Sequence, residues 1–163
     1  CIPLDPFYLT WKAREFGVNT RFIELAGEIN RDMPSYVISR LTLGLNQQAK
    51  PIKGSRILLC GVAYKKNVSD LRESPAIEVV RILSELGAEI SFSDEFVPVF
   101  EIDGKTIRSS ALTSELLGAN DACVILTNHD GVDYDLILNK SSLVVDSRGI
   151  YSAATGAENL VVA

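Results

Sequence analysis

The alternation of short apolar runs with amphipathic stretches after residue 50 is the feature that most constrains the fold. Strands alternating with helices favour a parallel sheet covered by helices on its faces. We therefore predict an α/β fold with a parallel sheet over residues 51–163, and a small hairpin around Asp103-Gly104. The expected strands lie at 57–62, 89–93, 122–127, 143–146 and 160–162, and the expected helices at 76–86, 113–117 and 134–138.

Residues 1–50 instead have a helical pattern, and we expect them to be the end of a helical domain. Asp5-Pro6 can cap and start a first helix, and Gly17 can end it. The polar stretch at 46–55 contains proline and glycine, and it predicts a linker to the α/β domain.

The second predicted helix is unusually long. Apolar side chains recur every three or four residues from Thr20 to Gln47, which is typical of one amphipathic helix. Pro34 lies inside it, so a kink or a new start is expected there. At about 1.5 Å per residue the helix is roughly 40 Å long, more than a small domain needs. The spare apolar length predicts a homodimer formed through this helix.

Ligands of open parallel sheets bind at the carboxyl ends of the strands. Three loops follow predicted strand ends and should share one edge of the sheet: residues 64–74, 127–130 and 146–149. The third loop contains Arg148, and arginine can bind a phosphate with two parallel hydrogen bonds. The second contains His129, the chain's single histidine, which we interpret as a surface or hydrogen-bonding residue.

The first of these loops is rich in positive charge where a dinucleotide-binding fold has closely spaced glycines. It supplies Lys65, Lys66 and Arg72, and Ser74 then opens the following helix. Cations beside a helix N-terminus favour a bound anion. Ion pairs with nearby carboxylates would instead make the same loop a solvated charged face. The spacing leaves both interpretations open.

Composition argues against several other classes of protein. The net charge of −5 is not that of a general nucleic-acid binder, and no apolar run reaches the about 18 residues of a membrane span. Cys60 and Cys123 lie in apolar runs without zinc-site or disulfide spacing, so we expect buried thiols in a cytoplasmic protein. We interpret Asp130, Asp133 and Asp135 as turn and cap residues, and no metal site is expected.

One more pair of residues could carry chemistry. Cys1 lies four residues before Asp5, near a predicted helix start. A helix N-terminus lowers the pKa of a thiol and favours the reactive thiolate, although the spacing alone does not separate this pair from a chance one. Because the sequence starts at Cys1 rather than Met, we expect it to be a fragment of a longer protein.

Three segments carry a resemblance to a known family: CIPLDPFYLTWKA, EINRDMP and GVAYKKNVSDLRESPAIEVV. Through them the chain resembles the UDP-glucose/GDP-mannose dehydrogenase family over essentially its whole length. The first segment is most similar to bacterial members that act on UDP-N-acetylhexosamines or related UDP-sugars. The resemblance implies that residues 1–50 end the family's central domain, and that residues 51–163 form its Rossmann-like, UDP-sugar-binding C-terminal domain.

Family members oxidise the C6 alcohol of a nucleotide sugar to a carboxylate with two NAD⁺. The resemblance implies that Cys1 captures the C6 aldehyde as a thiohemiacetal, which becomes a thioester, and that Asp5 assists the water or proton steps. It also implies that Tyr64, Lys65 and Arg148 contact the nucleotide sugar. The family's glycine-rich NAD loop belongs to a separate N-terminal domain, so no cofactor-binding residue is expected in this chain.

The sequence departs from the family pattern in two places. Leu4 stands where many members have lysine, and no GxGxxG follows a strand anywhere in the chain. We therefore expect the chain alone to have no dehydrogenase activity. The alternative is a non-catalytic nucleotide-binding module that dimerises through the long helix. A glycine-rich NAD motif encoded upstream would favour the enzyme over the module.

Overall fold

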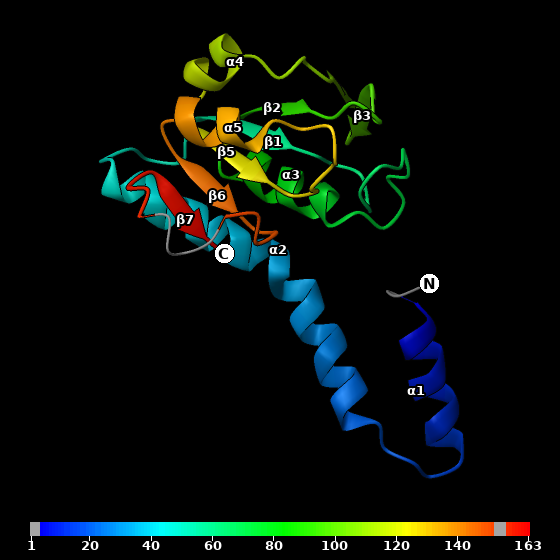
Figure 1. Cartoon of the computed structure of the whole chain (residues 1–163). Helices are drawn as coiled ribbons and strands as arrows, with labels where there is room; N and C mark the ends of the chain where they lie inside the picture. The colour runs from blue at the N-terminus through cyan, green and yellow to red at the C-terminus, as the bar shows by residue number, and fades with distance from the viewer. Residues whose placement is uncertain (1–3, 152–155) are drawn as a thin grey trace. The chain divides into compact units, whose positions relative to one another are not determined.

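The computed structural model describes residues 4–151 and 156–163. Within these residues five parallel strands form one sheet in the order β2-β1-β5-β6-β7 (Figure 1). This arrangement confirms the predicted α/β fold. The strands are β1 (Arg56–Cys60), β2 (Glu89–Ser93), β5 (Ala122–Ile125), β6 (Val144–Asp146) and β7 (Leu160–Val162). The helices are α1 (Asp5–Glu15), α2 (Arg21–Gln47), α3 (Pro75–Glu85), α4 (Ser114–Ala119) and α5 (Tyr134–Lys140).

The side chains of β1 alternate between two hydrophobic cores. Ile57 and Leu59 belong to a core that includes residues of α2 and α3, whereas Leu58 and Cys60 belong to a core with α4 and α5. Because both faces of the strand are covered, its apolar run is continuous rather than alternating. This burial fixes the strand, and with it the place where the following loop begins.

The predicted long helix forms as α2, a single α-helix that continues through Pro34. No new helix starts at the proline, although Pro34 cannot donate a backbone hydrogen bond to the helix. The chain divides into two compact units, one ending at Pro34 and the other running from Ser35 to Ala163. In the second unit, Val37, Leu41 and Leu45 of α2 are buried in the core that contains α3.

The first unit contains α1 and the first part of α2. The sequence predicted that Asp5 caps α1, but Leu4 is the cap residue, and it forms no side-chain hydrogen bond. Asp5 is instead the first helical residue, where the helix dipole still favours its negative charge. Gly17, with φ +71°, follows the end of the helix as expected.

The connection between β2 and α4 contains the predicted hairpin. Strands β3 (Val99–Ile102) and β4 (Lys105–Arg108) pair antiparallel. Asp103 and Gly104 have φ values of 47° and 75°, as a two-residue turn with two positive φ angles requires. None of the helices in the described part of the chain has the length and apolarity to cross a membrane.

Candidate functional site

Three loops leave the carboxyl ends of adjacent strands and define the candidate site. We call them the β1 loop (residues 61–74), the β5 loop (126–133) and the β6 loop (147–151). Parallel neighbours end on the same edge of a sheet, so all three lie at one edge, as predicted. From β1 the chain passes to β2 on one side, and β5 lies on the other side. Such a reversal of strand order is where open α/β sheets bind ligands.

The lone glycine of the β1 loop is needed where that loop meets the β5 loop. Gly61 has φ +74°, a left-handed conformation that favours glycine. A Cβ atom there would overlap the Thr127 carbonyl oxygen and lie 2.8 Å from the Thr127 Cβ. The Thr127 hydroxyl in turn donates a hydrogen bond of 2.6 Å to the Ala63 carbonyl. Gly61 thus permits the close approach of two loops rather than of a phosphate.

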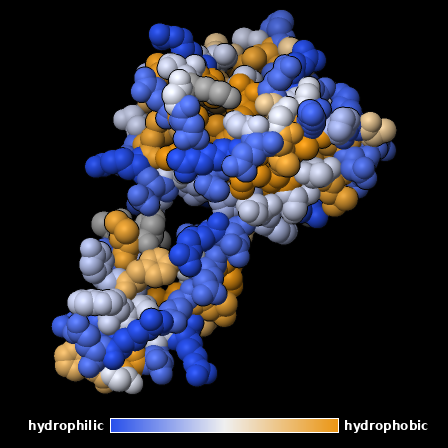
Figure 2. Space-filling view, turned by 180° about the vertical axis from the view of Figure 1, so that it is seen from behind, coloured by the Kyte–Doolittle hydropathy of each residue, from blue (hydrophilic) through white to orange (hydrophobic). Residues whose placement is uncertain are grey.

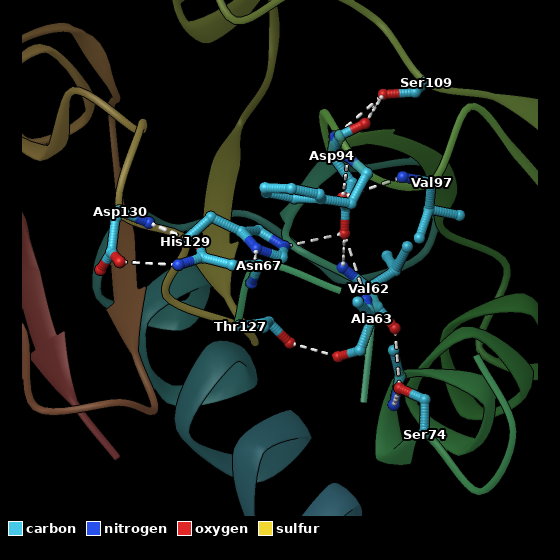
Figure 3. A network of polar contacts seen from close by, with 12 residues as sticks. Val62, Ala63, Asn67, Ser74, Asp94, Val97, Ser109, Thr127, His129 and Asp130 are labelled. Carbon is cyan, nitrogen blue, oxygen red and sulfur yellow. Dashed lines mark hydrogen bonds and ion pairs between the residues drawn. The ribbon is translucent and has the colours of Figure 1, made fainter. Parts of the chain in front are cut away.

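Asp94, directly after β2, uses the backbone donors of the β1 loop. One carboxylate oxygen accepts hydrogen bonds from the amides of Val62 (2.8 Å) and Ala63 (3.2 Å), and the other accepts from Phe96 (2.9 Å) and Val97 (3.1 Å) (Figure 3). Asp94 is 4% exposed. The two amides that would face a phosphate in a glycine-rich loop are therefore already occupied.

Asp94 was not predicted from the sequence. The available signal was its position: an acidic residue at the end of the second strand of a βαβ unit binds the ribose in dinucleotide-binding folds. In this chain the same position has a carboxylate turned inward, onto the backbone of Val62 and Ala63.

His129, in the β5 loop, is a buried hydrogen-bonding residue and not a surface residue, with 1% of it exposed. Its Nε2 lies 3.1 Å from the Asp94 carboxylate, and its Nδ1 accepts a hydrogen bond of 2.8 Å from the Asn67 amide (Figure 3). The imidazole also packs against Phe96, with ring centroids 4.9 Å apart. His129 thus links the ends of β2 and β5 to the β1 loop.

Two of the three cations of the β1 loop are paired with carboxylates. Lys66 lies 2.9 Å from Asp130, whose pKa is lowered mainly by this hydrogen bond. Arg72 contacts both carboxylate oxygens of Asp70 at 3.0 and 2.9 Å, and these hydrogen bonds lower the pKa of Asp70 to about 2. Lys65 is exposed and has no carboxylate within ion-pair distance among residues 4–151 and 156–163.

The residues proposed to contact the nucleotide sugar lie in two different loops. Lys65 Nζ lies 5.6 Å from the centre of the Tyr64 ring, so these two side chains come together. Arg148 lies in the β6 loop, exposed, with its backbone amide bound to the buried Asp146 carboxylate at 2.8 Å. Since β5 separates β1 from β6, the two strand ends are about 10 Å apart, or two strand spacings.

The N-terminus of α3, at the end of the β1 loop, is capped by the side chain of Ser74. Ser74 accepts a hydrogen bond from the Ala76 amide and donates one of 2.7 Å to the Val62 carbonyl. Pro75 follows it as the first helical residue, one position before the predicted start of the helix at residue 76. Because Ser74 is buried and its hydroxyl is engaged, the helix start contributes rigidity to the loop.

The structure describes one residue of the candidate catalytic pair. Cys1 lies outside the described residues, and Asp5 is an exposed residue of the first turn of α1. The other two thiols are buried, as predicted: burial raises the pKa of Cys60 to about 12 and that of Cys123 well above its usual range. Within the described ranges no group of three or more potential metal ligands is present.

Comparison with known proteins identifies the family. The model of the UDP-glucose/GDP-mannose dehydrogenase family, UDP binding domain, matches residues 58–153. The chain belongs to the UDP-glucose/GDP-mannose dehydrogenase family.

Individual relatives agree with this assignment. A UDP-N-acetyl-D-mannosamine dehydrogenase of Methanococcus maripaludis is 34% identical over 92% of this chain and 34% of its own length. An NDP-N-acetyl-D-galactosaminuronic acid dehydrogenase of Ralstonia solanacearum is 35% identical over 94% of this chain and 35% of its own length. The structure of a UDP-D-ManNAc dehydrogenase from Pyrococcus horikoshii has the same fold, with TM-score 0.80 and 24% identity over 99% of this chain and 37% of that one. The chain thus spans about a third of the length of the relatives it matches.

Proposed function

We propose that residues 51–163 bind the diphosphate of a UDP-sugar through Tyr64, Lys65 and Arg148. The observation that carries the proposal is the pairing of the cations in the β1 loop. Among the residues that the structure describes, Lys66 and Arg72 are paired with carboxylates, whereas Lys65 has no carboxylate partner and can contact an external anion. An ammonium beside an aromatic ring keeps its charge and its hydrogen-bond donors, and the ring orients it.

We assign the charge to side chains because the first two amides after Gly61 in the β1 loop are already engaged. The amides of Val62 and Ala63 donate to Asp94. Arginine and lysine form charge-assisted hydrogen bonds with phosphate that are stronger than neutral ones. Lys65 and Arg148, extending from strand ends about 10 Å apart, can approach one diphosphate from two sides.

The same loop does not fit the pyrophosphate of NAD. Gly61 is its one glycine, the amides after it are engaged, and the acid at the end of β2 has no free oxygen directed at a ribose. We therefore assign NAD binding to another part of the full-length protein. Family membership supports a role of that protein as an NAD-dependent UDP-sugar 6-dehydrogenase.

In that enzyme we assign covalent catalysis to Cys1. Its thiolate adds to the C6 aldehyde to give a thiohemiacetal; two-electron oxidation of this adduct gives a thioester, and water releases the carboxylate. Asp5 would assist the water or proton steps. Oxidation of the alcohol to the acid removes four electrons in all, which two NAD⁺ accept. We expect no turnover by residues 1–163 alone.

We further propose that the protein is a homodimer formed through α2. Its first part exposes an apolar stripe at helical spacing, made of Phe22, Leu25, Ile29 and Met33. Figure 2 shows hydrophobic residues, in orange, on the visible surface of this helical unit in the lower part of the view. Exposed apolar surface of this kind usually marks an interface.

Parallel titrations with UDP and NAD⁺ test the nucleotide assignment. Isothermal calorimetry on this chain should detect UDP binding, and NAD⁺ at the same concentration should not bind. A spectrophotometric assay with UDP-sugars and NAD⁺ should show no NADH above a blank. Binding of NAD⁺ as tight as that of UDP would overturn the assignment of the β1 loop, and steady NADH formation would overturn the expected inactivity of the chain.

A further inference from the structure

The buried side chains of Asp94 and His129 each accept a hydrogen bond from the backbone of the β1 loop (Figure 3). In the sequence these contacts lie on either side of Tyr64 and Lys65. Before these residues, Asp94 accepts the amide hydrogens of Val62 and Ala63. After them, His129 accepts the amide hydrogen of Asn67. The exposed pair thus lies between two anchored points of the backbone, one on each side.

The two anchors are joined to each other. His129 Nδ1 accepts from the Asn67 amide, so the ring proton lies on Nε2 and is donated to Asp94 over 3.1 Å. Both side chains are 0% exposed. The Asn67 backbone has φ +61°, a left-handed conformation that asparagine tolerates better than most residues with a side chain. The bond from its amide to His129 favours this conformation.

Neighbouring contacts reinforce the anchor at Asn67. Its side chain donates a hydrogen bond of 2.6 Å to the Asp130 carboxylate and accepts one of 3.1 Å from the Asp130 amide. The same carboxylate also pairs with Lys66, in an exposed ion pair that contributes little to the stability of the loop. These contacts turn the side chains of Lys66 and Asn67 toward the β5 loop, while the side chain of Lys65 lies against the Tyr64 ring.

Packing alone does not account for this arrangement. An apolar pair in place of Asp94 and His129 could fill the same space, but it would leave the buried amides of Val62 and Ala63 without acceptors, and the Asn67 amide would lose its partner. Unpaired buried donors are destabilising and rare in folded proteins. Asp94 and His129 therefore favour the one backbone conformation of the β1 loop in which these amides reach their acceptors.

We propose that Asp94 and His129 are positioning residues that hold Tyr64 and Lys65 in the conformation that contacts the diphosphate. The proposal rests on the UDP-sugar site described above. Neither residue touches the ligand; both act through the backbone of the β1 loop. Loss of either anchor lowers affinity for UDP because the lysine is no longer held in one place.

Two substitutions at one position separate the two contacts of the imidazole. The side-chain oxygen of asparagine lies near the place of Nδ1, so His129→Asn keeps an acceptor for the Asn67 amide and loses the donor to Asp94. The amide nitrogen of glutamine lies near the place of Nε2, so His129→Gln keeps the donor and loses the acceptor. Tyr134→Phe is the matched control: it removes a hydrogen bond of 2.9 Å to the His129 carbonyl and leaves the imidazole contacts in place.

The first measurement uses the protein without ligand. In ¹⁵N–¹H NMR spectra, His129→Gln should shift or broaden the amide signals of Tyr64, Lys65 and Asn67. His129→Asn should change them less, and Tyr134→Phe should leave them as in the parent. A ¹⁵N spectrum of the parent's imidazole should place the proton on Nε2. A proton on Nδ1 would overturn the proposal without any substitution.

The second measurement is a calorimetric titration of the same variants with UDP. His129→Gln should weaken binding about tenfold, the effect of one lost hydrogen bond of about 1.4 kcal/mol. His129→Asn should retain more of the affinity, and Tyr134→Phe all of it. Equal affinity for His129→Gln and the parent would refute the proposal, as would losses that merely follow each variant's thermal stability. If the parent itself does not bind UDP, the proposed function fails, while the NMR spectra still decide whether the two residues hold the loop.

Discussion

Replacement of Gly61 by alanine tests the contact that brings the β1 and β5 loops together. Gly61 has φ +74°, and a Cβ atom there would overlap the Thr127 carbonyl. Gly54 is a matched control in the same unit, with φ +78° and no atom within 4 Å of an added Cβ. The two substitutions share the backbone cost and differ only in the collision.

The expected magnitudes follow from these two terms. A left-handed alanine costs about 1–2 kcal/mol, and lower entropy of the unfolded chain offsets about 0.4–1 kcal/mol of it. Gly54→Ala should therefore lower the free energy of unfolding by about 1 kcal/mol. Overpacking a tight site adds about 1–3 kcal/mol, because Thr127 Cβ and its carbonyl must move. Gly61→Ala should therefore lower the free energy of unfolding by about 2–4 kcal/mol.

Urea unfolding followed by circular dichroism measures both values under one condition. The informative quantity is the difference between the two variants, because the shared backbone cost cancels in it. If Gly61→Ala is no less stable than Gly54→Ala, the two loops do not approach as closely as the structure shows.

Three further predictions concern charge, thiols and assembly. In a carbon-detected NMR titration, Asp70 should titrate near pH 2, and Arg72→Ala should return its pKa toward the ordinary value of about 3.9. Because the pKa of Asp70 is lowered in the folded protein, any stabilisation by this pair is present above pH about 4 and is lost as the pH falls through about 2. An unchanged titration of Asp70 in Arg72→Ala would contradict this pairing. In a Cys1→Ser variant, a thiol reagent at about pH 8 should not label the native protein, because Cys60 has a pKa of about 12 and is buried; rapid labelling without denaturant would be inconsistent with this burial. Light scattering at high micromolar concentration should give a dimer for the parent and a monomer for Ile29→Arg, and a monomeric parent would rule out the interface on α2.

The fold was predictable because the spacing of apolar residues in each segment matches the faces of that segment that are buried in the structure. The apolar run predicted as a strand at 57–62 forms most of β1, which ends at Cys60 and is buried on both faces. The start of α3 was equally readable, since Ser74 and Pro75 form a local cap that needs no distant partner. The cap expected from Asp5 did not form, because the helix begins one residue earlier and Asp5 lies within its first turn.

The candidate site was only partly predictable because its key contacts join distant parts of the sequence. The sequence identified the loop with Lys65, but it could not show which cation remains unpaired. That depends on Asp130, which lies 64 residues after Lys66. The role of Asp94 was missed for the same reason: its contact with Val62 spans 32 residues. No local pattern encodes such pairs.

The most direct test of the UDP site compares two neighbouring lysines of the β1 loop. Lys65→Ala removes a charge-assisted hydrogen bond to the diphosphate, worth about 1.5–3 kcal/mol, so calorimetry should show UDP affinity about ten- to a hundredfold lower. Arg148→Ala should have a similar effect. Lys66→Ala, whose side chain pairs with Asp130, should bind UDP about as well as the parent. If Lys65→Ala and Arg148→Ala also bind UDP as the parent does, the loop is a solvated charged surface and the proposed site is wrong.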